Sequence, residues 1–442
     1  MDSSFLIRQR KKKLIQLLHR IDLYESKIID ALYKDFKKPP FESFLTEINI
    51  VKDDLKFTIK NIEKWSKPQR VLPSLLNFPS SDYIYHQPYG KVLIISPWNY
   101  PFLLALSPVI SAFAAGNQVT LKPSELTPNT SSLLSKIIRE TFDVNEVVAI
   151  LGDAEMAKSL LDKKWDYIFF TGSVTVGKKV YQAAAKNLTP ITLELGGKNP
   201  CIVDETGDLQ LKARRIVWGK FLNAGQTCIA PDFLIIKSRI KKKFIELLIE
   251  EIQRAYSYNP ESSPDFCRII NKNNWLRLQK LLENQPVIYG GKHNEIDFYL
   301  SPTLVDEPHL NSELMKEEIF GPILPLISYD NFQDLDKIIS PLSKSLSLYV
   351  FTENGSFREK CIKHFSYGGG CINDTIVHFG NKRLPFGGIG NSGIGAYRGK
   401  KSFYTFTHQK SIVKRKNWID INLRYAPYKN KLKFVKKILR WI

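Results

Sequence analysis

The strongest constraint on the fold is a regular alternation of short apolar segments and helical patterns between residue 91 and about residue 205. The predicted strands cover 91–96, 117–121, 147–150, 166–170 and 190–194. The predicted helices cover 102–115, 128–140, 153–162 and 174–186. Alternation of this kind predicts a parallel sheet with helices on both faces, so we expect an α/β fold.

A second region of strands and helices follows, and a chain of 442 residues is long enough for more than one core. Its predicted helices lie near 208–222, 239–256, 272–283 and 356–365, and its predicted strands near 232–237, 347–351 and 368–373. The first 66 residues are predicted to be helical. Residues 82–89 and 400–415 are each predicted to be a strand, and the two could pair with each other.

Residues 92–121 contain no charged side chain, which raises the alternative of a membrane-spanning helix. Three prolines interrupt this segment, and it also contains two asparagines, which are poor guests in lipid. We therefore predict a buried strand, a turn, a helix and a second strand.

The five cysteines form no C-x-x-C motif, which indicates a reducing compartment rather than a disulfide framework. The N-terminal segment lacks the pattern of a secretory signal, so we expect a cytoplasmic protein. The net charge is +20, but residues 410–442 hold eleven Lys or Arg and one Asp, which is half of the excess. The rest of the chain is mildly basic, and we expect neither a nucleic-acid partner nor a metal site.

Two segments have features of a dinucleotide site. In FFTGSVTVGKKV, a turn with Gly172 and Gly177 joins a strand to a helix, and its backbone N–H groups can bind a pyrophosphate. In TLKPSEL, Lys122 and Glu125 follow a strand and can bind sugar hydroxyls. Both have simpler interpretations, because glycine is common in such turns and the charged residues also suit a solvated helix start.

Three residues have the chemistry of nucleophilic catalysis. In FLNAGQTCIAPDFLI, Cys228 is either a partly exposed thiol nucleophile or a packed side chain. In ITLELGGKNP, Glu194 lies between two leucines and is either a desolvated base or a solvated turn residue. In SPWNYP, the Asn99 amide can stabilise an oxyanion or simply serve the turn.

These segments belong to an ordered series along the chain. The series is SPWNYP, LKPSE, FTGS with a glycine four residues on, LELGGKNP, FLNAGQTCIAPDF, EEIFGP and LPFGGIGNSGIG. It resembles the aldehyde dehydrogenase superfamily, and GQTCIAPDF together with NDTIVHF before LPFGGIGNSG is similar to the class 3, fatty-aldehyde-like branch. The resemblance extends from about residue 3 to residue 428.

The resemblance implies NAD(P)-dependent oxidation of aldehydes, medium- or long-chain aliphatic or aromatic, to carboxylic acids. Cys228 matches the nucleophile, Glu194 the general base, and Asn99 the residue that stabilises the oxyanion together with the Cys228 N–H. The implied cofactor-binding residues are Trp98, Lys122, Glu125, Gly172, Ser173, Val176, Gly177, Glu318 and Phe320. Because a carboxylate at Glu125 repels a 2′-phosphate, we expect NAD to be preferred and NADP tolerated.

The resemblance also implies an aldehyde dehydrogenase-like fold, with a Rossmann-like cofactor domain, an α/β catalytic domain and a small β oligomerisation element of a homodimer. The expected boundaries are 1–78 and 90–205 for the NAD(P)-binding domain, 206–399 for the catalytic domain, 79–89 and 400–416 for the oligomerisation element, and 417–442 for a basic amphipathic tail.

Two residues depart from the pattern of the family. Cys371 stands where threonine or another small residue is expected, and Arg398 stands where histidine is common. Both bear on the shape of the aldehyde pocket rather than on the reaction. Two alternatives remain: a CoA-acylating dehydrogenase, against which the presence of Glu194 argues, and an inactive scaffold that binds membranes through its basic tail.

Residues 429–442 are predicted to form an amphipathic helix. Its apolar half contains Phe434, Val435, Ile438, Leu439, Trp441 and Ile442, and its basic half contains Lys433, Lys436, Lys437 and Arg440. The segment is too short to span a bilayer. It can lie on an anionic membrane surface or pack on the body of the protein, and we favour a peripheral membrane contact.

Overall fold

The structure is a computed structural model that describes residues 3–74, 77–420 and 422–440. The chain divides into two compact units. The larger unit combines the chain up to Trp65 with Pro88–Thr407, and the smaller unit combines Ser66–Gln87 with the chain from His408 onward. The functional domain boundaries given above remain a prediction.

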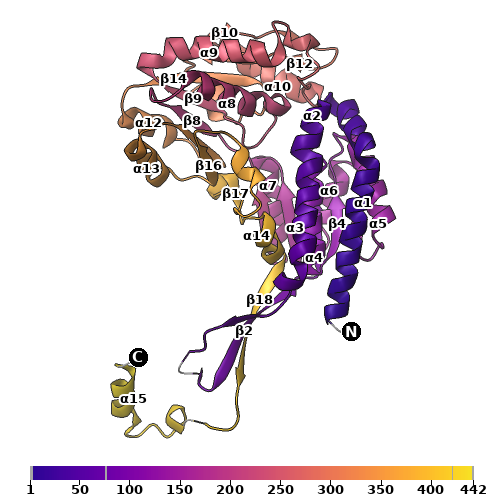
Figure 1. Ribbon diagram of the computed structural model, residues 1–442, viewed down its shortest axis with the longest axis vertical. Helices are drawn as coiled ribbons and strands as arrows, with labels where there is room; N and C mark the ends of the chain where they lie inside the picture. The colour runs from indigo at the N-terminus through magenta and orange to yellow at the C-terminus, as the bar shows by residue number, and fades with distance from the viewer. Residues whose placement is uncertain (1–2, 75–76, 421, 441–442) are drawn as a thin grey trace. The chain divides into compact units, whose positions relative to one another are not determined.

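The larger unit contains a six-stranded sheet with the order β17-β7-β6-β3-β4-β5. Its strands β4 and β17 are labelled in Figure 1. Its strands are β3 Lys91–Ile95, β4 Gln118–Lys122, β5 Val147–Ala149, β6 Tyr167–Thr171, β7 Ile191–Glu194 and the short β17 Gly393–Ile394. Only β17 runs antiparallel to its neighbour. The connecting helices are α4 Leu103–Ala115, α5 Pro128–Thr141, α6 Ala154–Leu161 and α7 Val174–Ala185. The strands and helices predicted for this region are confirmed.

The strand order of this sheet indicates where along its edge a ligand can bind. Strands β4 and β5 are added on one side of β3, and β6 and β7 on the other side. The direction of winding therefore reverses between β3 and β6. Open parallel sheets bind ligands beyond the carboxyl ends of the strands at such a reversal. The turns after β3 and after β6 belong to the predicted site, and both begin at this edge.

The uncharged segment 92–121 forms β3, α4 and β4, as predicted. Every residue of α4 is buried, which is the environment expected for a helix that is apolar on all sides. Among residues 3–74, 77–420 and 422–440, no helix is long and apolar enough to cross a membrane.

The N-terminal helices pack against this sheet layer and fix the position of α4. They are α1 Ser3–Phe36, α2 Pro40–Ser43, the π-helical turn η1 Phe44–Ile48 and α3 Asn49–Trp65. Helix α1 packs on α5, and α3 packs on α4. Glu47 accepts hydrogen bonds from the backbone N–H groups of Phe102 and Leu103 at 2.9 and 3.2 Å and also binds the buried Lys38. The start of α4 is thus tied to η1.

The second α/β region forms a seven-stranded sheet with the order β10-β13-β14-β9-β8-β15-β16. Its strands are β8 Pro200–Val203, β9 Phe233–Lys237, β10 Val287–Tyr289, β13 Thr303–Asp306, β14 Ile323–Tyr329, β15 Ser347–Phe351 and β16 Gly369–Ile372. Its helices are α8 Leu209–Phe221, α9 Ser238–Tyr256, α10 Lys272–Leu282, α11 Glu313–Lys316, α12 Phe332–Ile339 and α13 Gly355–His364. The elements predicted for this region are confirmed, but β8 and every element between α10 and β15 were not predicted.

The prediction of one continuous strand over 400–415 is wrong. The chain forms helix α14 Gly399–Thr405 before strand β18 Thr407–Arg415. Arg398 and Gly399 have positive φ angles of 87° and 52°, and the Ser402 hydroxyl accepts a hydrogen bond from the Arg398 N–H. This left-handed backbone interrupts an extended chain and lets a helical turn begin.

The three-stranded sheet β1-β2-β18 is formed by β1 Gln69–Val71, β2 Ser80–Pro88 and β18. The predicted pairing of 82–89 with the C-terminal strand is therefore confirmed. The smaller unit also contains helix α15 Lys431–Leu439, which confirms a helix in the tail. Trp441 and Ile442 of the predicted apolar half lie outside the described residues.

Candidate active site

The loop that presents Cys228 is held by buried amide groups. After α8 the backbone turns through Asn223 and Ala224 with φ of 56° and 51°, and Gly225 has φ of 72°. The Gln226 side-chain amide donates to the Asn223 and Arg268 carbonyls and accepts from the Ile270 N–H. These bonds fix the direction in which the chain leaves the turn.

Asn99, in the turn after β3, is buried against the same loop. Its Nδ2 donates to the Gln226 carbonyl at 3.0 Å, and Asn223 Nδ2 donates back to the Asn99 carbonyl at 2.9 Å. Asn199 Nδ2 donates to the Cys228 carbonyl at 2.8 Å. The asparagine expected to stabilise an oxyanion and the expected nucleophile are therefore parts of one hydrogen-bonded unit.

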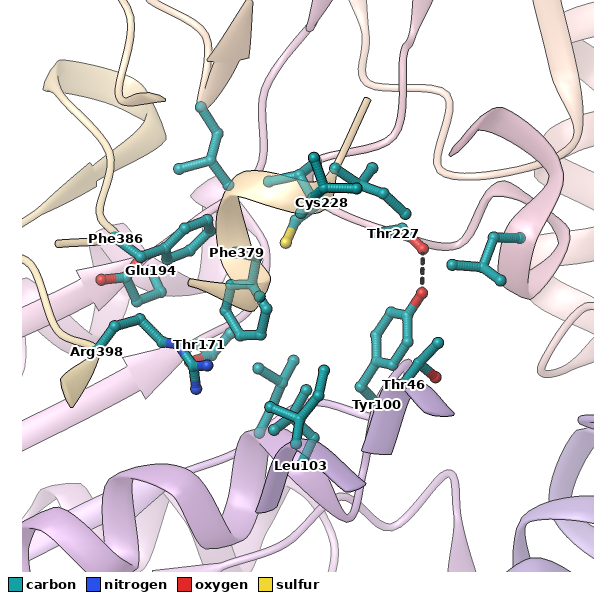
Figure 2. Close-up of a pocket in the computed structure, with 18 of the residues that line it drawn as sticks. Thr46, Tyr100, Leu103, Thr171, Glu194, Thr227, Cys228, Phe379, Phe386 and Arg398 are labelled. Atoms are coloured by element: carbon teal, nitrogen blue, oxygen red, sulfur yellow. Dashed lines mark hydrogen bonds between the residues drawn. The ribbon is translucent and has the colours of Figure 1, made fainter. Parts of the chain in front are cut away.

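Cys228 and Glu194 line the same cavity, which has a volume of about 360 Å³. Figure 2 shows the Cys228 sulfur directed into this cavity, with Glu194, Thr171 and Arg398 among the other lining residues. In the wall of this cavity, the hydroxyl groups of Tyr100 and Thr227 form a hydrogen bond with an oxygen–oxygen distance of 2.7 Å. Most of the remaining wall is apolar and includes Leu45, Ile50, Leu103, Trp218, Phe379 and Phe386.

Glu194 has the environment of a carboxyl that binds a proton tightly. It is 3% exposed, and neither carboxyl oxygen has a hydrogen-bond partner among the described residues. Burial raises the pKa of Glu194 well above its usual value. A desolvated carboxyl of this kind is suited to exchange protons at neutral pH.

Cys228 is half-buried, which leaves its sulfur accessible from the cavity. Burial raises the pKa of the Cys228 thiol well above its usual value, and the nearby Glu318 and Glu194 raise it further. The backbone N–H groups of Cys228 and Ile229 oppose this increase. The thiol is therefore neutral in this state, and its ionisation depends on the charge of the two carboxyls.

The residues expected at an adenosine ribose are adjacent. Lys122 ends β4 and is 2% exposed, and its Nζ donates to Glu125 Oε2 at 2.7 Å and to the Pro123 carbonyl at 2.9 Å. The Glu125 side chain is 42% exposed and can accept further donors. A fixed ammonium with an exposed carboxylate beyond a strand end fits sugar hydroxyls.

The turn after β6 leads into α7 as predicted. Ser173 caps this helix by accepting a hydrogen bond from the Val176 N–H at 3.3 Å. A Cβ on Gly177 would lie 2.6 Å from a Leu195 methyl group, so glycine permits the close approach of α7 to the chain after β7. The first turn of α7 offers N–H groups and a partial positive charge that fit a pyrophosphate.

Glu318 and Phe320 lie near the Cys228 loop. Glu318 Oε1 is buried without a hydrogen-bond partner among the described residues, and burial raises the Glu318 pKa to about 8. Phe320 has φ of 48° and contacts the edge of Trp98 with ring centroids 5.3 Å apart. A carboxyl oxygen without a hydrogen-bond partner among the described residues fits a ribose hydroxyl, and two nearby aromatic rings fit a flat heteroaromatic ring, so the residues present are compatible with a nicotinamide dinucleotide.

Comparison with known proteins identifies the family. The model of the aldehyde dehydrogenase family matches residues 3–412. The chain belongs to the aldehyde dehydrogenase family. It is similar to 4,4′-diaponeurosporen-aldehyde dehydrogenase of Staphylococcus aureus, with 44% identity over 98% of this chain and 94% of the relative. It is also similar to aldehyde dehydrogenase family 3 member H1 of Arabidopsis thaliana, with 40% identity over 97% of this chain and 90% of the relative.

Solved structures of aldehyde dehydrogenases have the same fold. A substrate-bound Staphylococcus aureus AldH matches with a TM-score of 0.96 and 44% identity over 98% of this chain and 95% of that chain. An NAD-dependent aldehyde dehydrogenase from Sinorhizobium meliloti matches with a TM-score of 0.85 and 26% identity over 97% of this chain and 86% of that chain. The predicted fold and the class 3 resemblance are confirmed. The protein is an aldehyde-oxidising enzyme with NAD or NADP as its cofactor.

Several residues that support the Cys228 loop of this aldehyde dehydrogenase were not predicted from the sequence, among them Asn199, Gln226 and Glu42. Glu42 of α2 is buried, and its Oε2 accepts the Asn223 N–H at 3.0 Å. Burial raises the Glu42 pKa to about 7, although the nearby Lys38 opposes this increase. No spacing in the sequence connects positions 42 and 223. The only signal was a glutamate flanked by aromatic residues in PPFESF.

Glu42→Gln should stabilise the enzyme in a pH-dependent way. Because the folded-state pKa of Glu42 is about 7 and the ordinary value is 4.5, the folded state binds this proton more tightly than the unfolded chain. Stability is therefore lost as pH rises between these values, by ~3 kcal/mol in total. Thermal unfolding should show a higher Tm for Glu42→Gln at about pH 8 and little difference at about pH 5.

A second variant separates the charge of Glu42 from its hydrogen bond. Glutamine still accepts the Asn223 N–H, whereas Glu42→Leu leaves that N–H buried and unpaired, so kcat should fall by roughly 10-fold only in the leucine variant. Equal kcat values in the two variants would show that the Asn223 bond does not position the loop.

Proposed function

We propose that the enzyme oxidises apolar aldehydes through a covalent intermediate on Cys228. The observation that carries this proposal is the presence of the Cys228 thiol and the Glu194 carboxyl in one largely apolar cavity of about 360 Å³. A thiol nucleophile, a desolvated base and an apolar substrate pocket are the parts that such a reaction requires.

In the first step, the Cys228 thiol releases its proton to solvent, its sulfur bonds to the aldehyde carbon, and the carbonyl π bond breaks so that the oxygen gains negative charge. The Cys228 N–H and the Asn99 amide donate hydrogen bonds to this oxygen. Asn99 Nδ2 carries two N–H groups and uses one on the Gln226 carbonyl, so one remains for the oxyanion. Removal of one such donor reduces the rate by about 10²–10³-fold in comparable sites.

When bound, a nicotinamide cofactor would supply the oxidant by accepting a hydride from the substrate carbon. Lys122 and Glu125 would hold its adenosine ribose, the α7 turn its pyrophosphate, and Glu318 and Phe320 its nicotinamide end. These roles are supported by the exposed Glu125 carboxylate, the N–H groups of α7 and the unpaired Glu318 oxygen.

The acyl group that remains on Cys228 is a thioester, and Glu194 accepts a proton from the water that attacks it. The products are the carboxylic acid and the free thiol. A CoA-acylating enzyme would transfer the acyl group to another thiol and would not need this base. The position of Glu194 in the wall of the Cys228 cavity favours hydrolysis.

The apolar wall supports medium- or long-chain aliphatic or aromatic aldehydes as substrates. The Staphylococcus aureus relative is named for an aldehyde of 4,4′-diaponeurosporene, and this name supports a preference for apolar aldehydes. Burial of each additional methylene contributes about 0.8 kcal/mol, so affinity should rise with chain length until the pocket is filled.

The smaller unit is proposed to support a homodimer in the cytoplasm. Strand β18 lies at the edge of the order β1-β2-β18, so its outer edge is available to pair with a second copy. Helix α15 exposes Leu432 and Phe434 beside Lys433, Lys436 and Lys437. This combination supports a peripheral contact with an anionic membrane.

Glu194→Gln should separate hydride transfer from hydrolysis. Attack by Cys228 needs no hydrolytic base, so rapid mixing with saturating NAD should give a burst of reduced cofactor followed by slow turnover. Cys228→Ala is the matched control and should give neither a burst nor turnover, while it still binds NAD. Full steady-state turnover of Glu194→Gln would show that another group activates the water.

Glu125→Gln should improve the use of NADP. The wild-type enzyme should have a higher kcat/KM for NAD than for NADP, because the Glu125 carboxylate repels the 2′-phosphate. In the Glu125→Gln variant, the ratio of kcat/KM for NAD to kcat/KM for NADP should be smaller, mainly because the KM for NADP is lower. A wild-type enzyme that strongly prefers NADP would contradict the assignment of Glu125.

Deletion of residues 429–442 should weaken binding to anionic liposomes. If the helix delivers substrate from a membrane, the KM for long aldehydes should rise much more than the KM for short ones. Replacement of Lys433, Lys436 and Lys437 by glutamine keeps the helix and removes three of its positive charges, so it should weaken liposome binding as well. Unchanged liposome binding in both variants would assign the tail a purely structural role.

A further inference from the structure

Arg398 is a cation in the wall of an otherwise largely apolar pocket. It lies in the segment between β17 and α14, lines the cavity that contains Cys228 and Glu194, and is only 3% exposed (Figure 2). Its backbone has φ of 87°, and its guanidinium lies 4.4 Å from the centre of the Phe379 ring. The side chain is therefore fixed by its backbone and by an aromatic neighbour.

Among the residues that the structure describes, only Nη1 of the Arg398 guanidinium has hydrogen-bond partners. Nη1 donates to Asp54 Oδ2 at 2.6 Å and lies 3.5 Å from the Ser107 hydroxyl. Nε is buried and has no hydrogen-bond partner, and Nη2 makes no hydrogen bond within the part of the chain that the structure describes. A guanidinium presents five N–H donors, and a buried donor without a hydrogen-bond partner is unfavourable.

The charges around Arg398 determine which kind of hydrogen-bond acceptor its remaining N–H groups can bind favourably. Asp54 already balances the positive charge of Arg398. Two further carboxyls line the cavity: Glu194, which is buried, and Asp53, which pairs with Lys382 at 2.6 Å. An additional carboxylate would lose its hydration beside an already neutralised cation, whereas a neutral oxygen would gain a charge-assisted hydrogen bond.

We propose that Arg398 binds a neutral oxygen acceptor, such as a ketone, hydroxyl or ester carbonyl, on the chain of the aldehyde substrate. This inference rests on the proposed function, because it requires the substrate to occupy the cavity beside Cys228. It makes the preferred substrate an apolar aldehyde that carries one oxygen function away from the reacting carbon. Arg398 is then a specificity-determining residue.

Kinetic comparison of matched substrates tests the proposal. The probes are saturated alkanals, oxo-alkanals of the same length in which a ketone carbonyl is moved stepwise along the chain, and alkanals that end in a carboxylate. For one ketone position or two adjacent positions, kcat/KM should exceed that of the matched alkanal by about 10-fold or more, mainly through a lower KM. The carboxylated aldehydes should show no such gain.

Two variants separate recognition from structural support. Arg398→Lys keeps a positive charge for Asp54 but lacks the planar set of donors. Arg398→Met combined with Asp54→Asn removes the ion pair as a whole, so that no uncompensated charge is buried. Both should bring the ketone-to-alkanal ratio of kcat/KM close to one. Thermal unfolding of each variant provides the check on folding.

A purely structural role would change kcat/KM for all aldehydes by the same factor and leave the ratio intact, which would overturn the proposal. A wild-type enzyme without a preferred ketone position, or with a preference for the carboxylated aldehydes, would also overturn it. Alkanal oxidation with NAD or NADP would still support the proposed function in those cases, whereas loss of all aldehyde oxidation in the wild type would reject both.

Discussion

The site depends on the left-handed turn that precedes Cys228. Positive φ angles at Asn223 and Ala224 each cost about 1–3 kcal/mol, so the turn persists only where its surroundings determine it more strongly. Hydrogen bonds made by the buried side chains of Glu42, Asn99 and Gln226 hold the turn in this conformation. Gly225 has positive φ, and a Cβ at this position would collide with the carbonyl of Gly321. The turn therefore sets both the position of the thiol and the approach of the segment that carries Glu318.

That approach has an electrostatic consequence. Glu318 and Glu194 both raise the pKa of Cys228, and burial raises the pKa of all three groups. The ionisation of the thiol is therefore linked to the charge of both carboxyls. A neutral thiol is a weak nucleophile. Reactivity then requires a change in the charge of its surroundings, which occupancy of the site can provide.

The sequence predicted the parts of the fold that have a strong local pattern. The strands and helices from β3 to β7 were found because each is apolar at the appropriate period and is bounded by turn residues. Strand β14 was missed because Pro325 interrupts it, and β11 His293–Asn294 and β12 Tyr299–Leu300 are too short to produce a period. The segment of helix α14 has the sequence pattern of a strand, because its aromatic residues suit both a strand and a helix. The positive φ of Arg398 cannot be predicted from the sequence, because such angles are typical of glycine rather than arginine.

The same difference separates the proposed reacting groups from the groups around them. Asn99 lies in the turn after β3, Glu194 is the last residue of β7, and Cys228 lies in the turn before β9. Small residues and prolines mark these segments in the sequence. Arg398 acquires its environment from Asp54, which is 344 positions away in the chain. Neither residue has a motif, because the pair depends on α3 packing against α4 and on the backbone turn before α14. The proposed reacting groups could therefore be inferred from local sequence, whereas the polarity of the proposed substrate pocket follows from tertiary packing.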